Sequence, residues 1–378
     1  MNNKVKIFIS RTLKLLALAV PLICLIVFAQ ENLFFYKDHD TRRLEKFYEE
    51  EKDSLDVILM GASEVTNGYV PGYAYELYGF TSYMYAMDSN RGPMYTSQLK
   101  EVLKHQNPQV IVVEIMGFIY PPSWEVYDEE RLRIYEESIP FSWNKVQTIL
   151  EQPFENKISF FVPLIKYHSD LPTAHERLIN LKEEKKELPD LKGVVSKPTI
   201  YQGEGDWGTA YDPATFDLHE DCRDSLIEFL EYCEAEKIEN VVFVNFPRLL
   251  LDPSINSYIV AVDIVEEILN EYGHQLIDLY EESDLIGLDD KHDFGDKHHL
   301  NLYGQMKMTE YLGELLVDEY KVSPRPQTAE NIEKWEKCVT DTRMHFQVVD
   351  AMCYKNMEWS VHEEMYEWIS PAKILGEG

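Results

Sequence analysis

The sequence predicts an α/β protein built on a parallel sheet, and three observations carry this prediction. Short apolar runs alternate with segments of helical periodicity through the middle of the chain. Of the 378 residues, 45% are hydrophobic, which supplies enough apolar surface to offset the entropy of ordering the chain. An apolar stretch preceded by basic residues stands apart at the N-terminus. We therefore expect a folded α/β domain that follows a membrane segment.

Five short apolar runs predict the strands of the sheet. Such runs are typical of strands that are buried on both faces. They cover residues 56–60, 81–84, 110–115, 241–245 and 274–279. Helical periodicity predicts helices at about 93–106, 221–236, 255–272 and 302–320. Strands that alternate with helices imply a parallel sheet covered by helices on both faces.

Two segments fall outside this alternation. Residues 120–219 carry scattered aromatic residues, prolines and charge, and we expect an insertion of short helices there, between the third and fourth strands. Prolines also break the chain after residue 322, and an amphipathic, aromatic-rich tail follows. The expected organisation is an N-terminal segment 1–36, an α/β domain 37–322 that contains the insertion, and a helical tail 323–378.

The N-terminal segment has the composition of a membrane anchor. Four basic residues and no acidic one precede an apolar run at 15–29, and an aromatic flank at 33–36 extends it to a plausible span. Basic residues before such a run favour a cytoplasmic N-terminus, with the rest of the chain translocated. A cleaved signal peptide ending at Val27-Phe28-Ala29 is the alternative. We expect a single-pass cell-membrane anchor and an extracytoplasmic domain.

The charge of the chain limits its partners. The 67 Asp and Glu residues against 36 Lys and Arg residues give a formal net charge of −31. Such a surface repels phosphate backbones, so nucleic acid is not an expected partner.

Four cysteines lie outside the apolar run and allow three disulfide pairings. Cys222 and Cys233 lie on one predicted helix, too far apart along its axis to bond each other. Buried free thiols are the expectation.

The first motif that could take part in catalysis is Gly61-Ala62-Ser63, directly after the first predicted strand. In an open parallel sheet, ligands bind beyond the carboxyl ends of the strands, near the point where the strand order reverses. Ser63 is therefore placed where a nucleophile could act. A plain turn or a helix N-cap explains the same residues equally well.

The second motif, Asp296-Lys-His-His299-Leu-Asn301, opens the last predicted helix. An Asp and a His three residues apart at a helix start can hydrogen-bond, so that the carboxylate orients the imidazole. A serine hydroxyl needs such a base near pH 7. Ser63, His299 and Asp296 are thus candidates for nucleophile, base and orienting acid. His298 is the alternative base, but its spacing from Asp296 fits less well.

These motifs resemble the first and last sequence blocks of the SGNH (GDSL-like) hydrolase and acyltransferase superfamily. The resemblance covers roughly residues 53–320. It implies a flavodoxin-like three-layer α/β/α sandwich with a five-stranded parallel sheet. It also implies a catalytic triad of Ser63, His299 and Asp296, with no cofactor and no metal.

The oxyanion-binding blocks depart from the family pattern. The second block normally supplies a Gly whose N–H helps to bind the oxyanion, and here Ser89 or Gly92 could take that place, while the side chain of Asn90 or Asn67 could replace the Asn donor of the third block. The third block normally supplies an Asn after the third strand, but residues 114–121 contain none. Loss of one such donor typically costs about 2.7–4 kcal/mol of barrier unless another group replaces it.

The missing Asn and the N-terminal anchor narrow the resemblance to one branch of the superfamily. In these two features the sequence resembles the membrane-anchored branch typified by teichoic-acid D-alanylation (DltD-like) proteins and alginate O-acetylation proteins. Members of that branch work beside a membrane-bound O-acyltransferase (MBOAT) and move small acyl groups onto envelope polymers. The resemblance therefore implies a serine O-acyltransferase or esterase with an MBOAT partner and a teichoic acid or exopolysaccharide acceptor.

Other interpretations stay open. A dense acidic and histidine cluster near the end of the domain suggests a metal site; its members are Asp289, Asp290, His292, Asp293, Asp296, His298 and His299. Arg91 and Arg248 follow strand ends and could hold an anionic acceptor or a substrate phosphate, although surface ion pairing is the commoner explanation in so acidic a protein. A membrane-tethered, polymer-binding subunit on a decayed SGNH scaffold is the alternative function.

Overall fold

The computed structural model describes residues 3–29, 39–120, 126–167, 189–201, 217–249 and 257–355. The chain divides into two units by its internal contacts. The larger unit, His39–Thr148 with Leu188–Gly378, contains the sheet. The smaller unit, Met1–Asp38 with Ile149–Glu187, contains the N-terminal helix.

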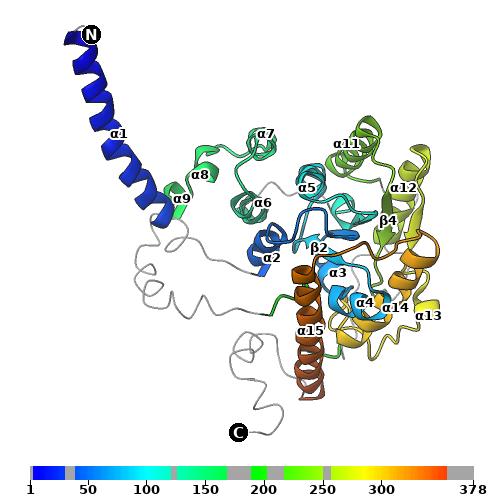
Figure 1. The fold of residues 1–378 in the computed structure, drawn as a ribbon. Coiled ribbons are helices and arrows are strands. Elements are labelled where there is room, and N and C mark those ends of the chain that lie inside the picture. The colour runs from blue at the N-terminus through cyan, green and yellow to red at the C-terminus, as the bar shows by residue number, and fades with distance from the viewer. Residues whose placement is uncertain are drawn as a thin grey trace, which may run out of the picture. The chain divides into compact units, whose positions relative to one another are not determined.

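The sheet of the larger unit has five parallel strands in the order β2-β1-β3-β4-β5 (Figure 1). Its strands are β1 (Val57–Gly61), β2 (Ser82–Ala86), β3 (Val110–Glu114), β4 (Val241–Asn245) and β5 (Leu276–Asp278). This confirms the predicted α/β class and the parallel five-stranded sheet. The order is the flavodoxin-like one, and it reverses between β1 and β3, which makes the carboxyl ends of these two strands the expected ligand position.

The strands appear in the sequence as continuous apolar runs because both of their faces are buried. Every residue of β1, β2, β3 and β4 is buried, as in parallel sheets with helices on both faces. The edge strand β5 is only half-buried along its three residues. It is shorter than the predicted run 274–279 and pairs with β4 alone.

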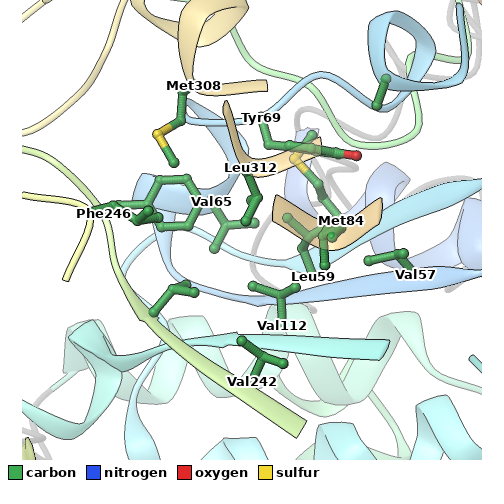
Figure 2. Close-up of a cluster of buried hydrophobic side chains, with 14 of the residues drawn as sticks. Val57, Leu59, Val65, Tyr69, Met84, Val112, Val242, Phe246, Met308 and Leu312 are labelled. Carbon is green, nitrogen blue, oxygen red and sulfur yellow. The ribbon is translucent and has the colours of Figure 1, made fainter. Parts of the chain in front are cut away.

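One face of the sheet packs against α14 (Leu302–Asp318). Figure 2 shows Leu59, Val112 and Val242 of neighbouring strands facing Met308 and Leu312 of this helix, in one buried cluster. Helix α4 (Pro71–Tyr78) packs beside α14 on the same side of the sheet.

The other face of the sheet packs against α2 (His39–Phe47) and α11 (Glu220–Glu236). Phe47 lies edge-on to Tyr83 of β2, and Phe229 lies edge-on to Phe243 of β4. Helix α5 (Gly92–His105) packs against α11 on this side (Figure 1). Helices thus cover both faces, as predicted.

Four predicted helices are present as α5, α11, α12 (Ser257–Glu271) and α14. Several short helices were not predicted one by one. They are α3 (Ser63–Thr66), the 3-10 turn η2 (Ile115–Phe118), α6 (Val126–Ser138), α7 (Trp143–Glu151), α8 (Ile158–Phe161), α9 (Leu164–Tyr167) and α13 (Ser283–Ile286). Residues 121–125, 168–188 and 202–216 of the expected insertion lie outside the described residues.

The C-terminal segment forms one long helix, α15 (Ala329–Lys355), which packs on α4. Its Trp335 is fully buried and stacks on Tyr75 with ring centroids 5.0 Å apart. Residues 356–378 of the expected tail lie outside the described residues.

The N-terminal helix α1 (Asn3–Ala29) belongs to the smaller unit. Its segment Phe8–Ala29 has 22 residues and a mean hydropathy of 2.5, so it is long and apolar enough to cross a membrane. The aromatic flank at 33–36 lies outside the described residues.

The four cysteines outside the apolar N-terminal run are buried and form no disulfide bond; they are Cys222, Cys233, Cys338 and Cys353.

Candidate active site

Ser63 is positioned by a tight turn at the carboxyl end of β1. Gly61 ends the strand, and a Cβ atom there would lie only 2.7 Å from Cβ of Glu114 on the neighbouring β3. A side chain at position 61 would therefore push the two strand ends apart. Helix α3 begins two residues later, at Ser63, next to the point where the strand order reverses.

The loop before α14 carries the other two residues. Asn301 is fully buried and caps α14, because its side chain accepts hydrogen bonds from the N–H groups of Tyr303 and Gly304. The Asp296 carboxylate accepts the backbone N–H groups of His298 and His299 at 2.8 and 3.0 Å. These bonds hold the loop in a shape that directs His299 at the end of β1.

Ser63, His299 and Asp296 form a continuous chain of hydrogen bonds. Ser63 Oγ lies 2.7 Å from His299 Nε2. His299 Nδ1 lies 2.8 Å from Oδ1 and 2.9 Å from Oδ2 of Asp296. The structure therefore brings together three residues that the sequence places up to 236 positions apart. The His299 side chain is 15% exposed, so the site is sheltered and still open to solvent.

The charges around Asp296 favour its ionised form. Burial alone would raise the pKa of this carboxyl, but the hydrogen bond and charge of His299 and the charge of Lys197 outweigh burial and hold the pKa below its ordinary value. Lys197 Nζ lies 3.3 Å from the carboxylate. A carboxylate at Nδ1 places the imidazole proton there and leaves Nε2 free to accept from Ser63.

His298 does not take the place of the base. Its ring centroid lies 6.1 Å from that of His299, and its buried Nδ1 has no hydrogen-bond partner among the described residues. Burial, together with the charges of Arg248 and His299, lowers the pKa of His298 to about 4. His298 is therefore neutral near pH 7, and His299 is the imidazole that contacts Ser63.

Neither a scan against protein-family models nor a search of curated proteins produced a match.

The side chain of Asn90 is already committed, which contradicts its expected role as an oxyanion donor. Its amide group donates to the Gly61 carbonyl at 3.0 Å and to Gln98 Oε1 at 2.8 Å. Both N–H bonds of the amide are thus used to join the end of β1 to α5.

Gly92 and Ser89 remain candidates through their backbone alone. A Cβ atom at Gly92 would lie 2.8 Å from Cβ of Ser225, so this glycine lets α5 approach α11 closely. Ser89 has a left-handed backbone with φ of 53°. Their predicted role at the oxyanion stays a prediction.

Arg248 is buried and held in an ion pair, and its role in holding an anionic substrate stays a prediction. Its guanidinium lies 2.8 Å from a Glu64 carboxylate oxygen and 4.1 Å from the ring centre of Tyr258. Ion pairing was the alternative, and it is realised in the interior rather than at the surface. The pair joins residues 184 positions apart, and no local pattern in the sequence indicates it. Arg91 precedes α5 and is half-buried, and its substrate role stays a prediction.

Three members of the late acidic cluster, His292, Asp293 and Asp296, form hydrogen bonds and ion pairs. Asp293 accepts a hydrogen bond from Lys307 at 2.6 Å and pairs with His292 at 2.9 Å, while Asp296 is hydrogen-bonded to His299. In the described part of the chain, the one group close enough to share a metal ion comprises His39, Asp40 and Asp88. Its Asp40 is paired with Arg43 and Arg131, and these two positive charges oppose the binding of a cation there.

Proposed function

We propose that this protein is a membrane-anchored, extracytoplasmic serine O-acyltransferase or esterase that acts on acyl esters of a cell-envelope polymer. The observation that supports this proposal is the unbroken chain of hydrogen bonds from Ser63 through His299 to Asp296. A serine held in this way at the carboxyl edge of a parallel sheet has the parts needed for acyl transfer.

In this mechanism, Ser63 Oγ attacks the acyl carbonyl while His299 Nε2 takes the hydroxyl proton. Asp296 stabilises the imidazolium that forms. The N–H of Ser63 supplies one donor for the oxyanion, because the first N–H groups of a helix have no acceptor within it. A second amide donor would come from the segment at Ser89.

The ester C–O bond then breaks, and His299 returns the proton to the leaving oxygen. A polymer hydroxyl or water next attacks the acyl-enzyme, with His299 taking its proton. The same groups thus perform both halves of the reaction. The choice between acyl transfer and hydrolysis depends on which acceptor reaches the acyl-enzyme.

The helix α1 supports a site of action beside the membrane. Its basic N-terminal end favours a cytoplasmic start, which would leave the serine site outside the cell. An envelope polymer such as a teichoic acid or exopolysaccharide is the acceptor that fits this location. A membrane-bound O-acyltransferase (MBOAT) is the partner that would deliver the acyl group.

A second candidate is a membrane-tethered polymer-binding subunit with little catalytic power. The end of β3 favours this second candidate. The SGNH pattern places a hydrogen-bond donor after this strand, whereas the Glu114 carboxylate accepts the N–H groups of Met116 and Ala62.

Covalent labelling separates the two candidates. The full-length protein in detergent is expected to react with a fluorophosphonate, and Ser63→Ala is expected to abolish the reaction. Ser323→Ala is a matched control, because this exposed serine lies by Gln109, next to the start of β3. A folded wild-type protein that takes up no label would favour the binding subunit.

A further inference from the structure

The nucleophile has a second neighbour that accepts hydrogen bonds. Ser63 Oγ lies 2.7 Å from His299 Nε2 and 3.4 Å from Oε2 of Glu64, the next residue in the chain. Both groups compete for one hydroxyl proton, but only His299 is connected to Asp296. Whether Ser63 is activated therefore depends on what holds Glu64.

Glu64 is held by a buried ion pair. Arg248 Nη2 lies 2.8 Å from Glu64 Oε1, and the two side chains are 3% and 7% exposed. Arg248 is fixed in turn by Tyr120, whose hydroxyl accepts from it at 3.2 Å, and by the ring of Tyr258. The pair joins the segment after β4 to the start of α3.

Burial shifts the pKa values of the other ionisable groups near this pair towards their uncharged forms. Burial and the charge of Glu64 raise the pKa of Glu114 well above its ordinary value. Burial also raises the pKa of Tyr95 and Tyr258, and it lowers that of His298 to about 4. Among these described neighbours, Arg248 is thus the group that balances the charge of Glu64.

We propose that Arg248 is a positioning residue for Ser63. By pairing with Glu64, it leaves His299 as the acceptor of the Ser63 proton. Without Arg248, a buried and unpaired carboxylate would compete for the hydroxyl hydrogen bond, because charged acceptors form the stronger bonds. Its charge would also oppose the negative charge that develops on the attacked carbonyl. This inference rests on the proposed serine chemistry.

Three variants of the full-length protein test it through the rate of fluorophosphonate labelling. Arg248→Met leaves Glu64 unbalanced beside Ser63, and we expect labelling about 10- to 100-fold slower. Glu64→Gln removes the competing charge, and we expect a rate within about threefold of wild type. The double variant is expected to recover most of the rate that Arg248→Met loses.

The asymmetry between the single variants separates positioning from a structural role. Either single change breaks the same buried pair, so both lower the stability of the fold. Only Arg248→Met exposes Ser63 to a free carboxylate. Each labelling rate is therefore divided by the fraction of that variant that is folded, which thermal unfolding measures. Arg248→Lys, which keeps the charge, is expected to retain most of the rate.

Arg325→Met is the matched control. It removes an arginine from another partly buried ion pair, 2.8 Å from Asp56, just before β1. Equal slowing by Arg248→Met and Glu64→Gln, with no recovery in the double variant, would overturn the inference. A folded wild-type protein without any labelling would instead overturn the proposed function, so the two failures are distinguishable.

Discussion

Among single residues, Asp296 has two roles in the site. It accepts the N–H groups that shape the loop, and it holds Nδ1 of His299. Asp296→Asn is expected to slow fluorophosphonate labelling of Ser63 by about 10²- to 10⁴-fold at pH 7, because the amide no longer stabilises the imidazolium. Asp284→Asn, at an exposed position of α13, serves as the control. Labelling of Asp296→Asn at the wild-type rate would contradict the triad.

Glu114 should make stability depend on pH. Burial and the charge of Glu64 raise its pKa well above 4.5 in the folded protein, while the unfolded chain releases the proton near 4.5. The unfolded state is thus favoured progressively as pH rises from about 4.5 towards the folded pKa. Glu114→Gln removes this loss, so its free energy of unfolding relative to wild type should increase between pH 5 and pH 8. Urea unfolding measures it, and equal pH slopes would refute the prediction.

The candidate triad was predictable because each residue type carries recognisable chemistry. Ser63 follows a strand, and Asp296 lies three residues before His299 at a helix start. The Glu64–Arg248 pair was not predictable. Glu64 and Arg248 are 184 positions apart, and no local pattern connects them.

Helix α14 shows how packing opposes local propensity at the scale of elements. Gly313 lies where α14 meets α4, and a Cβ atom there would collide with the ring of Tyr78. Gly313→Ala improves helix propensity by about 1 kcal/mol. The forced separation of the helices costs about 1–3 kcal/mol. We therefore expect net destabilisation in chemical unfolding, while Glu314→Ala, the exposed neighbour, should change little. A stabilised Gly313→Ala would show that the interface relaxes.

The predictability of the elements followed their burial and length. Strands β1 to β4 were located to within two residues because both of their faces are buried. The eight-residue α4 and the four-residue α3 were missed. Helices this short carry too few turns for a periodic signal.

At the scale of the whole molecule, α1 is long and apolar enough to cross a membrane, and in the proposed function it keeps the serine site beside that membrane. The full-length protein is expected to remain in the membrane fraction after an alkaline carbonate wash. Replacing both Leu18 and Leu22 by Arg adds about 2.5–3.5 kcal/mol per residue at the centre of the span and should release the protein. Leu285→Arg, at a 76% exposed side chain of α13, is the control. Wild-type protein in the soluble fraction would contradict the anchor.

Composition, periodicity and short spacing were enough to locate the apolar N-terminal helix, the alternation of strands and helices, and the candidate residues Ser63, Asp296 and His299. These features are local, because each is encoded within a few turns of chain. Three-dimensional packing was needed to show that His299 rather than His298 contacts Ser63, that Asn90 joins β1 to α5, and that Arg248 pairs with Glu64. Each of those outcomes depends on hydrogen bonds between segments distant in sequence, and such bonds exist only once the sheet has brought its strand ends together.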